Sequence, residues 1–183
     1  MSGSVGDNLA RASGVIASAG GGTILSVKSV KFTSTASETG TAPTQLSDFD
    51  MSFAPTTSDG KLYFQCCLSI GVSGGDPTAG YFYDVTNTTI IGAYADTAGS
   101  RLRTSWGMVM TNGAYLNTVA FGCWHEPGST DSRDYTIFGN AQGATTLYIN
   151  RTGDYGNDTS IMNAVRASTF TITEYAASAV TLT

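Results

Sequence analysis

The sequence has few charged side chains. Asp, Glu, Lys and Arg make up 13% of its 183 residues, roughly half the usual share of about 25%. Nine residues are Lys or Arg and the net charge is −5, which argues against a basic patch for nucleic acid. The polar surface must then consist of Ser, Thr, Asn and Gly. This composition is common among all-β extracellular or virion proteins.

Cysteine and histidine are scarce as well. The odd count of cysteines (Cys66, Cys67 and Cys123) argues against a full disulfide framework, and no CxxC spacing indicates zinc. His125 is the single histidine, and no serine stands in a G-x-S-x-G elbow. We therefore assign no catalytic residue and expect His125 to pack at the edge of a loop.

No acidic cluster has the spacing of a known metal site. The segment Asp154 to Asp158 offers hard oxygen ligands that suit calcium, but it does not match the EF-hand loop. A plain turn rich in Gly, Asn and Asp is the favoured interpretation. The sequence therefore predicts no metal and no cofactor.

No long apolar run is present. A membrane-spanning helix needs about 20 apolar residues, and no run approaches that length. The N-terminus lacks the basic segment and apolar core of a signal peptide. We expect a protein made in a cytoplasm, not exported by the usual route, with no membrane partner.

Short strands with turn signals between them are what the sequence does contain. In 168–175, Phe170 and Ile172 alternate with threonines, so one face is apolar and the other is polar. A similar strand is expected at 145–150. Further strands are expected at 23–32, 46–54, 61–72, 81–85, 89–92, 104–111, 116–124 and 134–139. The alternation in 23–32 slips by one residue near Ser29, which suggests a β-bulge, and residues 33–44 are expected to form a polar loop. The strand at 61–72 is nearly continuously apolar and is expected to be central and buried. This pattern predicts an all-β fold, an antiparallel β-sandwich or barrel.

The two ends of the chain differ from this pattern. Residues 1–22 end in three glycines, which suit a joint, so this segment is interpreted as an arm. It is either an unstructured terminus or an anchoring peptide that orders against a larger assembly. The β-sandwich domain is expected at 23–175 and a short tail at 176–183.

Several short motifs, in a fixed order, resemble a β-sandwich domain of bacteriophage structural proteins, notably those of cyanophages. The resemblance covers about Gly22 to Tyr175. The motifs are Gly22-Thr23-Ile24-Leu25-Ser26-Val27, Phe49-Asp50-Met51-Ser52-Phe53-Ala54-Pro55, Ile91-Gly92, Asp96-Thr97-Ala98-Gly99-Ser100-Arg101, Tyr148-Ile149-Asn150-Arg151, and Ser168-Thr169-Phe170-Thr171-Ile172-Thr173-Glu174. The Cys66-Cys67 pair and the segment Trp124 to Glu126 depart from the pattern.

The resemblance implies a non-enzymatic virion protein with a homotrimeric, jelly-roll-like sandwich. Because only a short arm precedes the domain, we expect a capsid decoration or cement protein (a head spike) on the virion surface, made in the host bacterial cytoplasm. Its partners would be itself and the major capsid protein. The arm residues expected to attach it to the virion are Asp7, Asn8, Leu9, Arg11, Val15 and Ile16.

A short tail-fibre or receptor-binding tip is the alternative. Its loops would contact a host surface protein or glycan, and Tyr81, Tyr83 and Trp124 are the candidates for that contact. Most aromatic residues of the strands are expected in the core. The rest suit a subunit interface or a sugar-binding face, where Tyr and Trp are enriched.

Overall fold

The structure is a computed structural model that describes residues 23–40, 42–46, 48–74, 76–92, 103–110, 113–143, 145–153 and 165–182. This part of the chain is built of strands, with one short 3-10 helix, η2 (Ala177–Ala179). The strands are β1 (Ile24–Phe32), β2 (Ala36–Thr39), β3 (Thr44–Gln45), β4 (Met51–Phe53), β5 (Lys61–Val72), β6 (Pro77–Asp84), β7 (Thr89–Ile91), β8 (Trp106–Val109), β9 (Asn117–His125), β10 (Arg133–Ala141), β11 (Thr146–Ile149) and β12 (Ser168–Tyr175).

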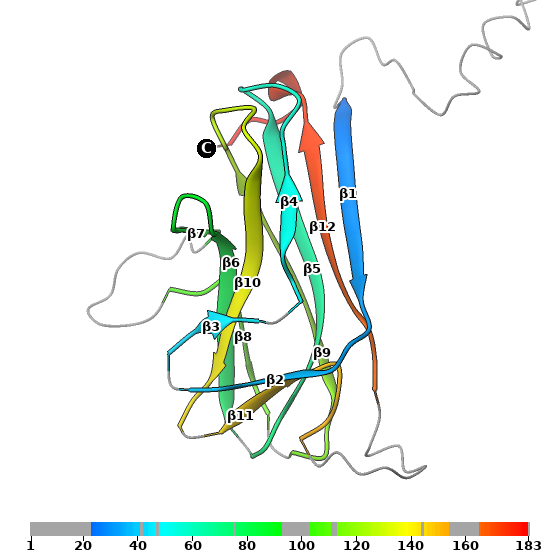
Figure 1. Ribbon diagram of the computed structural model, residues 1–183, viewed down its shortest axis with the longest axis vertical. Coiled ribbons are helices and arrows are strands. Elements are labelled where there is room, and N and C mark those ends of the chain that lie inside the picture. Colours follow the sequence, from blue (N-terminus) through cyan, green and yellow to red (C-terminus); the bar gives the residue numbers. More distant parts are fainter. Residues whose placement is uncertain are drawn as a thin grey trace, which may run out of the picture.

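These strands form two sheets that pack face to face, and Figure 1 shows them as two layers. The first sheet has the order β1-β12-β5-β11-β2, with β9 on the other edge of β5. The second sheet has the order β3-β10-β6-β7, with β4 also on β10 and β8 also on β6. The pairs between these strands are antiparallel.

The connectivity is that of a jelly roll. Four strands of the first sheet lie in the order β1, β12, β5, β9, and four of the second lie in the order β4, β10, β6, β8. Along the chain, β1, β4, β5 and β6 alternate between the sheets, β8 stays in the second, and β9, β10 and β12 alternate again. This is the double-sheet arrangement of eight strands in two Greek keys. The predicted all-β, jelly-roll-like sandwich is confirmed.

Strand β5 organises the first sheet. Its inward side chains include Leu62, Phe64 and Cys66, all with no exposed surface. Strand β9 pairs with one edge of β5, while β12 and then β11 pair with the other. The predicted strands at 145–150 and 168–175 therefore lie end to end along β5 and are not neighbours.

Aromatic side chains join the two sheets at the centre of the core. The Phe64 ring lies 5.5 Å from that of Phe82 and 5.0 Å from that of Tyr135, both in the second sheet. The Phe170 ring of β12 lies 5.5 Å from Phe82. These residues have no exposed surface, so most strand aromatics of the central region are core residues, as expected.

Two local predictions were wrong. The alternation in 23–32 suggested a bulge near Ser29, but the register against β12 shifts between Ile24 and Ser26 and is regular from there to Phe32. As a result Val27 faces outward and is 57% exposed. The segment 33–44 was expected to be a loop, but it contains β2, which pairs with β11, and the start of β3.

The ends of the domain meet at one point. The Ala176 amide donates a hydrogen bond of 2.9 Å to the Thr23 carbonyl, so the chain enters and leaves the first sheet at the same end (Figure 1). Helices within the described segments are too short and too polar to cross a membrane. The division into arm, sandwich and tail stays a prediction.

Candidate interaction faces

The residues assigned to virion attachment lie outside the described segments. Asp7, Asn8, Leu9, Arg11, Val15 and Ile16 all belong to the first 22 residues. Their role stays a prediction. The acidic loop Asp154 to Asp158 and the motif from Asp96 to Arg101 also lie outside these segments. In the described segments, His, Cys, Asp and Glu side chains form no group that suits a metal ion.

The structure separates the three residues proposed for host contact. Trp124 is in β9 and stands beside Tyr63 on the outside of the first sheet. Tyr81 and Tyr83 are in β6 and face outward from the second sheet, since Phe82 between them is buried in the core. The three candidates therefore lie on two opposite faces, and their role in host contact stays a prediction. We call the two outer surfaces the first-sheet face and the second-sheet face.

The first-sheet face carries a strip of three aromatic rings at one end. The rings of Tyr63 and Trp124 lie 4.9 Å apart and are tilted by 48°. The ring of Tyr175 lies 5.3 Å from Trp124, nearly edge-on at 61°. All three are half-buried. They follow from the strand alternation, because their neighbours Leu62, Phe64 and Glu174 point inward.

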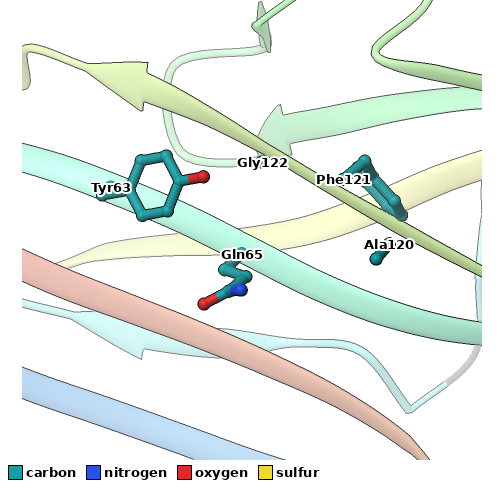
Figure 2. A pocket seen from close by; sticks show the side chains of 5 residues that line it. All are labelled: Tyr63, Gln65, Ala120, Phe121 and Gly122. Carbon is teal, nitrogen blue, oxygen red and sulfur yellow. The ribbon is translucent and has the colours of Figure 1, made fainter.

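A shallow hollow lies beside this strip. It measures about 260 Å³ and is lined by Tyr63, Gln65, Ala120, Phe121 and Gly122. Figure 2 shows the Tyr63 ring face-on, with its hydroxyl toward Gly122, and the Gln65 side chain next to it. A Cβ at position 122 would lie 2.6 Å from the Tyr63 hydroxyl oxygen and 2.7 Å from the Phe64 carbonyl oxygen. The glycine is therefore needed for the hydroxyl end of the Tyr63 ring to lie against β9.

The second-sheet face carries an apolar patch. Phe138 of β10 stacks on Tyr81 at 5.7 Å and contacts Tyr83 at 4.5 Å. Ile90 lies directly opposite Tyr83 and is 39% exposed, and Val109 at the end of β8 is 68% exposed. Tyr81 itself is 7% exposed, and burial, with a smaller effect of Tyr83, raises the pKa of its hydroxyl.

His125 is the last residue of β9 and packs at the edge of the loop that follows, as expected, with its ring turned toward aromatic side chains of the core. It lies opposite Leu62, and its ring contacts those of Phe64 and Tyr135, each at 5.9 Å. Burial lowers its pKa from 6.5 to about 4. Its Nε2 is buried and has no hydrogen-bond partner in the described part of the chain. These contacts are those of a neutral, partly buried side chain at the margin of the core.

Asn150, of the Tyr-Ile-Asn-Arg motif, ties four strands together. It is fully buried with φ of +61°, a conformation that Asn tolerates better than most residues. Its Nδ2 donates to the Phe32 carbonyl at 3.1 Å and to the Ser34 carbonyl at 2.8 Å. Its Oδ1 accepts from the Ser168 hydroxyl at 2.6 Å. The Ser168 oxygen in turn accepts from the Ser69 amide at 2.9 Å.

Glu174, which ends the last motif, is a second buried polar centre. Its carboxylate accepts four hydrogen bonds, from the Thr56 amide at 2.8 Å, the Thr56 hydroxyl at 2.8 Å, the Thr57 amide at 3.1 Å and the Ser26 hydroxyl at 2.7 Å. Burial alone would raise its pKa, but the hydrogen bonds outweigh burial and hold the pKa below the ordinary value. The motif glutamate therefore pins the loop after β4 to the first sheet.

Sequence reasoning missed Tyr63 and Gln65. Residues 61–72 were interpreted as a nearly continuous apolar strand, central and buried. The signal was nevertheless present, because Lys61, Tyr63 and Gln65 alternate with Leu62, Phe64 and Cys66. A half-polar row at every second position is typical of a strand with one face toward solvent.

Comparison with known proteins gives little. No family model and no curated protein matches the chain. Solved structures of infectious bursal disease virus show a distant likeness. The Gx strain gives a TM-score of 0.38 at 16% identity over 81% of this chain and 36% of that chain. The Gt strain gives 0.40 at 17% identity, over 83% and 38%.

A mutant VP2 protein of the same virus, in derived T=1 particles, gives a TM-score of 0.37 at 15% identity, over 83% of this chain and 37% of that chain. The chain thus spans little more than a third of the length of these proteins. TM-scores and identities this low identify neither a family nor an activity.

Proposed function

We propose that the chain is a non-enzymatic virion structural protein of a bacteriophage, a homotrimeric capsid decoration or cement protein that binds the shell through residues 1–22. One observation carries the proposal. The polar residues of the phage-like motifs are the ones that hold this jelly roll together. Asn150 joins β1, β5, β11 and β12, and Glu174 joins β12 to β1 and to the loop after β4.

Other residues of these motifs also have structural roles in the fold. Ile91 is 3% exposed, and Gly92 has φ of +71° with Cys123 where its Cβ would be. The Arg151 guanidinium stacks over the Tyr148 ring at 4.0 Å, a cation–π contact. The resemblance is therefore one of fold-determining residues, which supports a shared architecture. Jelly rolls are also common in viral capsid domains, though fold alone does not give function.

The second-sheet face is the surface that we assign to the trimer. Ile90, Tyr83 and Val109 place apolar side chains on it, and exposed apolar surface of this kind is typical of contacts between subunits. Three arms on one rigid trimer would then bind the capsid much more tightly than a single arm. In this arrangement the first-sheet face remains open to solvent.

Light scattering after gel filtration tests the trimer. Val109→Glu puts a charge into the proposed interface, and we expect the mass to fall from trimer to monomer. Val27→Glu is the matched control, because Val27 is similarly exposed but lies on the first-sheet face. A monomeric wild type, or a mass that falls with Val27→Glu alone, would overturn the assignment.

Co-sedimentation with undecorated capsids tests attachment. We expect saturable binding of the full chain and loss of binding when residues 1–20 are deleted, with the unfolding transition unchanged. Capsid occupancy that survives the deletion would exclude the arm as the anchor.

A second candidate function is a short tail-fibre or receptor-binding tip. The hollow beside Tyr63 favours this second function. An aromatic hollow on an outer face suits contact with a ligand, and it has no role if the protein only attaches to the virion through its arm. The same experiment with intact host cells in place of capsids separates the two functions. Binding to cells alone would identify an adhesin.

A further inference from the structure

The hollow on the first-sheet face has the chemistry of a saccharide site, and we propose that it binds the apolar face of a neutral sugar ring. Its floor and wall are formed by Tyr63, Gly122 and Gln65, with Trp124 beside them. Nothing in this assignment depends on the trimer or on capsid binding, because one copy of the chain carries the whole hollow.

The Tyr63 ring is held in one orientation. Its hydroxyl end points toward Gly122, which has no side chain to displace it. A ring held in this way presents one π face to solvent. That face is electron-rich and attracts the slightly positive C–H groups on one side of a pyranose. Trp124, at 4.9 Å and 48° to it, forms a second surface at an angle, which suits a ring that is stacked on one side and bounded on the next.

The side-chain amide of Gln65 is available to a ligand. This side chain is exposed and makes no hydrogen bond to the described residues. An amide offers both donors and an acceptor, which matches vicinal hydroxyl groups that donate and accept. The Tyr63 hydroxyl at the rim adds a further donor and acceptor.

The surroundings of the hollow are uncharged. The outward residues around the hollow on β5, β9 and β12 are neutral: Tyr63, Gln65, Cys67, Ala120, Gly122, Trp124, Thr171, Thr173 and Tyr175. Lys61 at the margin is already paired with Glu126 at 2.6 Å. The described residues that line the hollow offer no cation to an acidic glycan or an acidic peptide, whereas a neutral sugar needs none.

The size of the hollow sets how much of a ligand it takes. At about 260 Å³ it is below the roughly 300–1,000 Å³ of pockets that enclose drug-sized ligands. It therefore holds one ring and leaves both glycosidic ends in solvent. This is the arrangement expected for a ring within a longer surface polysaccharide.

The test uses the full chain and methyl glycosides of glucose, galactose, mannose, rhamnose and N-acetylglucosamine at millimolar concentrations. Binding is followed by saturation-transfer NMR and by tryptophan fluorescence, since Trp124 is the more exposed of the two tryptophans and Trp106 is 4% exposed. We expect saturable binding of at least one neutral glycoside. The methyl glycoside of glucuronic acid should bind more weakly than its glucose counterpart.

Variants locate the binding. Tyr63→Phe keeps the ring and should change the affinity less than about threefold, while Tyr63→Ala should weaken it about tenfold or more, as expected for loss of a stacking partner. Gln65→Ala, at an exposed side chain that leaves the core intact, should weaken it severalfold. Tyr83→Ala, an aromatic removed from the opposite face, is the matched control and should have no effect.

Three results would overturn the proposal. They are no saturable binding of any neutral glycoside, binding that Tyr63→Ala and Gln65→Ala leave unchanged, and a change in oligomeric mass on Gln65→Ala, which would make the hollow a subunit contact. Failure of the capsid or trimer experiments changes none of these outcomes, and a negative sugar experiment leaves those proposals standing.

Discussion

The two ends of the sandwich are held by different chemistry. At one end Asn150, Ser168 and Ser69 form a neutral network of amide and hydroxyl groups. At the other end the buried polar groups are ionisable: the Glu174 carboxylate, the Asp84–Arg133 ion pair at 3.3 Å, and His125. Ser168 and Glu174 lie at opposite ends of the same strand, β12. We call the end at Ser168 the neutral end and the end at Glu174 the ionisable end.

This difference between the two ends determines where pH affects the stability of the fold. Hydrogen bonds between neutral groups have the same strength across the physiological pH range. A buried carboxylate or imidazole contributes a stability that depends on its protonation state. The ionisable end should therefore weaken in acid while the neutral end holds. Urea unfolding at a fixed protein concentration measures how the two ends differ in their response to mutation and pH.

Asn150→Ala should have the largest effect. It leaves two buried carbonyls and the Ser168 hydroxyl without their partner and puts alanine at a positive φ, so we expect a loss of about 4 kcal/mol. The loss should be the same at pH 5 and pH 7.5. Asn150→Gly, which tolerates this φ, separates the two causes and should cost less. A loss that shrinks in acid would contradict a neutral end.

Acidification of the wild type should come next. His125 has its pKa lowered to about 4 by burial, and the charged groups near it are Asp84, Arg133 and Glu126. Folding therefore favours the neutral imidazole. Stability should be complete above pH 6.5 and decline between about pH 6.5 and 4, by on the order of 3 kcal/mol.

His125→Phe is the matched variant, because a phenyl ring fills the same contact with Phe64 and Tyr135. It should flatten the stability profile between pH 6.5 and 4. An unchanged slope in this variant would assign the acid sensitivity to another group.

Glu174→Gln should cost about 2 kcal/mol at pH 7.5, because a neutral amide accepts the four hydrogen bonds less well and turns an N–H toward donors. The carboxylate has a lowered pKa, so its contribution is present above its unfolded pKa and is lost as the pH falls through the folded value. The difference between variant and wild type should therefore narrow below about pH 4. A constant difference down to pH 2 would rule out a role of the charge.

Lys61→Gln should have the smallest effect. Its ion pair with Glu126 is at the ionisable end, but the glutamate side chain is 53% exposed. Exposed pairs contribute about 0–1 kcal/mol, and we expect a change below about 0.5 kcal/mol at either pH. A larger loss would mean that surface charge, and not burial, sets the pH response of this end.

Much of the fold could be predicted from the sequence, because strand alternation is local. Phe170 and Ile172 face the core as their spacing indicates, and the hairpin of β6 and β7 pairs Asp84 with Thr89. Pairing over long distances is not written in local patterns. The sequence of residues 145–150 does not indicate that β11 pairs with the same edge of β5 as β12 does.

The candidate sites were less predictable. Trp124 was identified as a candidate because it is a tryptophan next to a predicted loop. Its partner Tyr63 was not identified, because the composition of its strand indicated complete burial. Which face an aromatic residue occupies depends on the inward neighbours at the next position, and these can be assigned only once the register is known. The separation of Tyr81 and Tyr83 from Trp124 has the same cause.

The meeting of Thr23 and Ala176 has a mechanical consequence. Any tension carried by residues 1–22 enters the sandwich at the start of β1, an edge strand held by β12 from Ile24 to Phe32. Tension along the strand is shared by all of these pairs at once, whereas tension away from the sheet peels them one by one. The register irregularity between Ile24 and Ser26 lies at the first point to be stretched. The direction of pull would therefore decide how much force the root of the arm withstands.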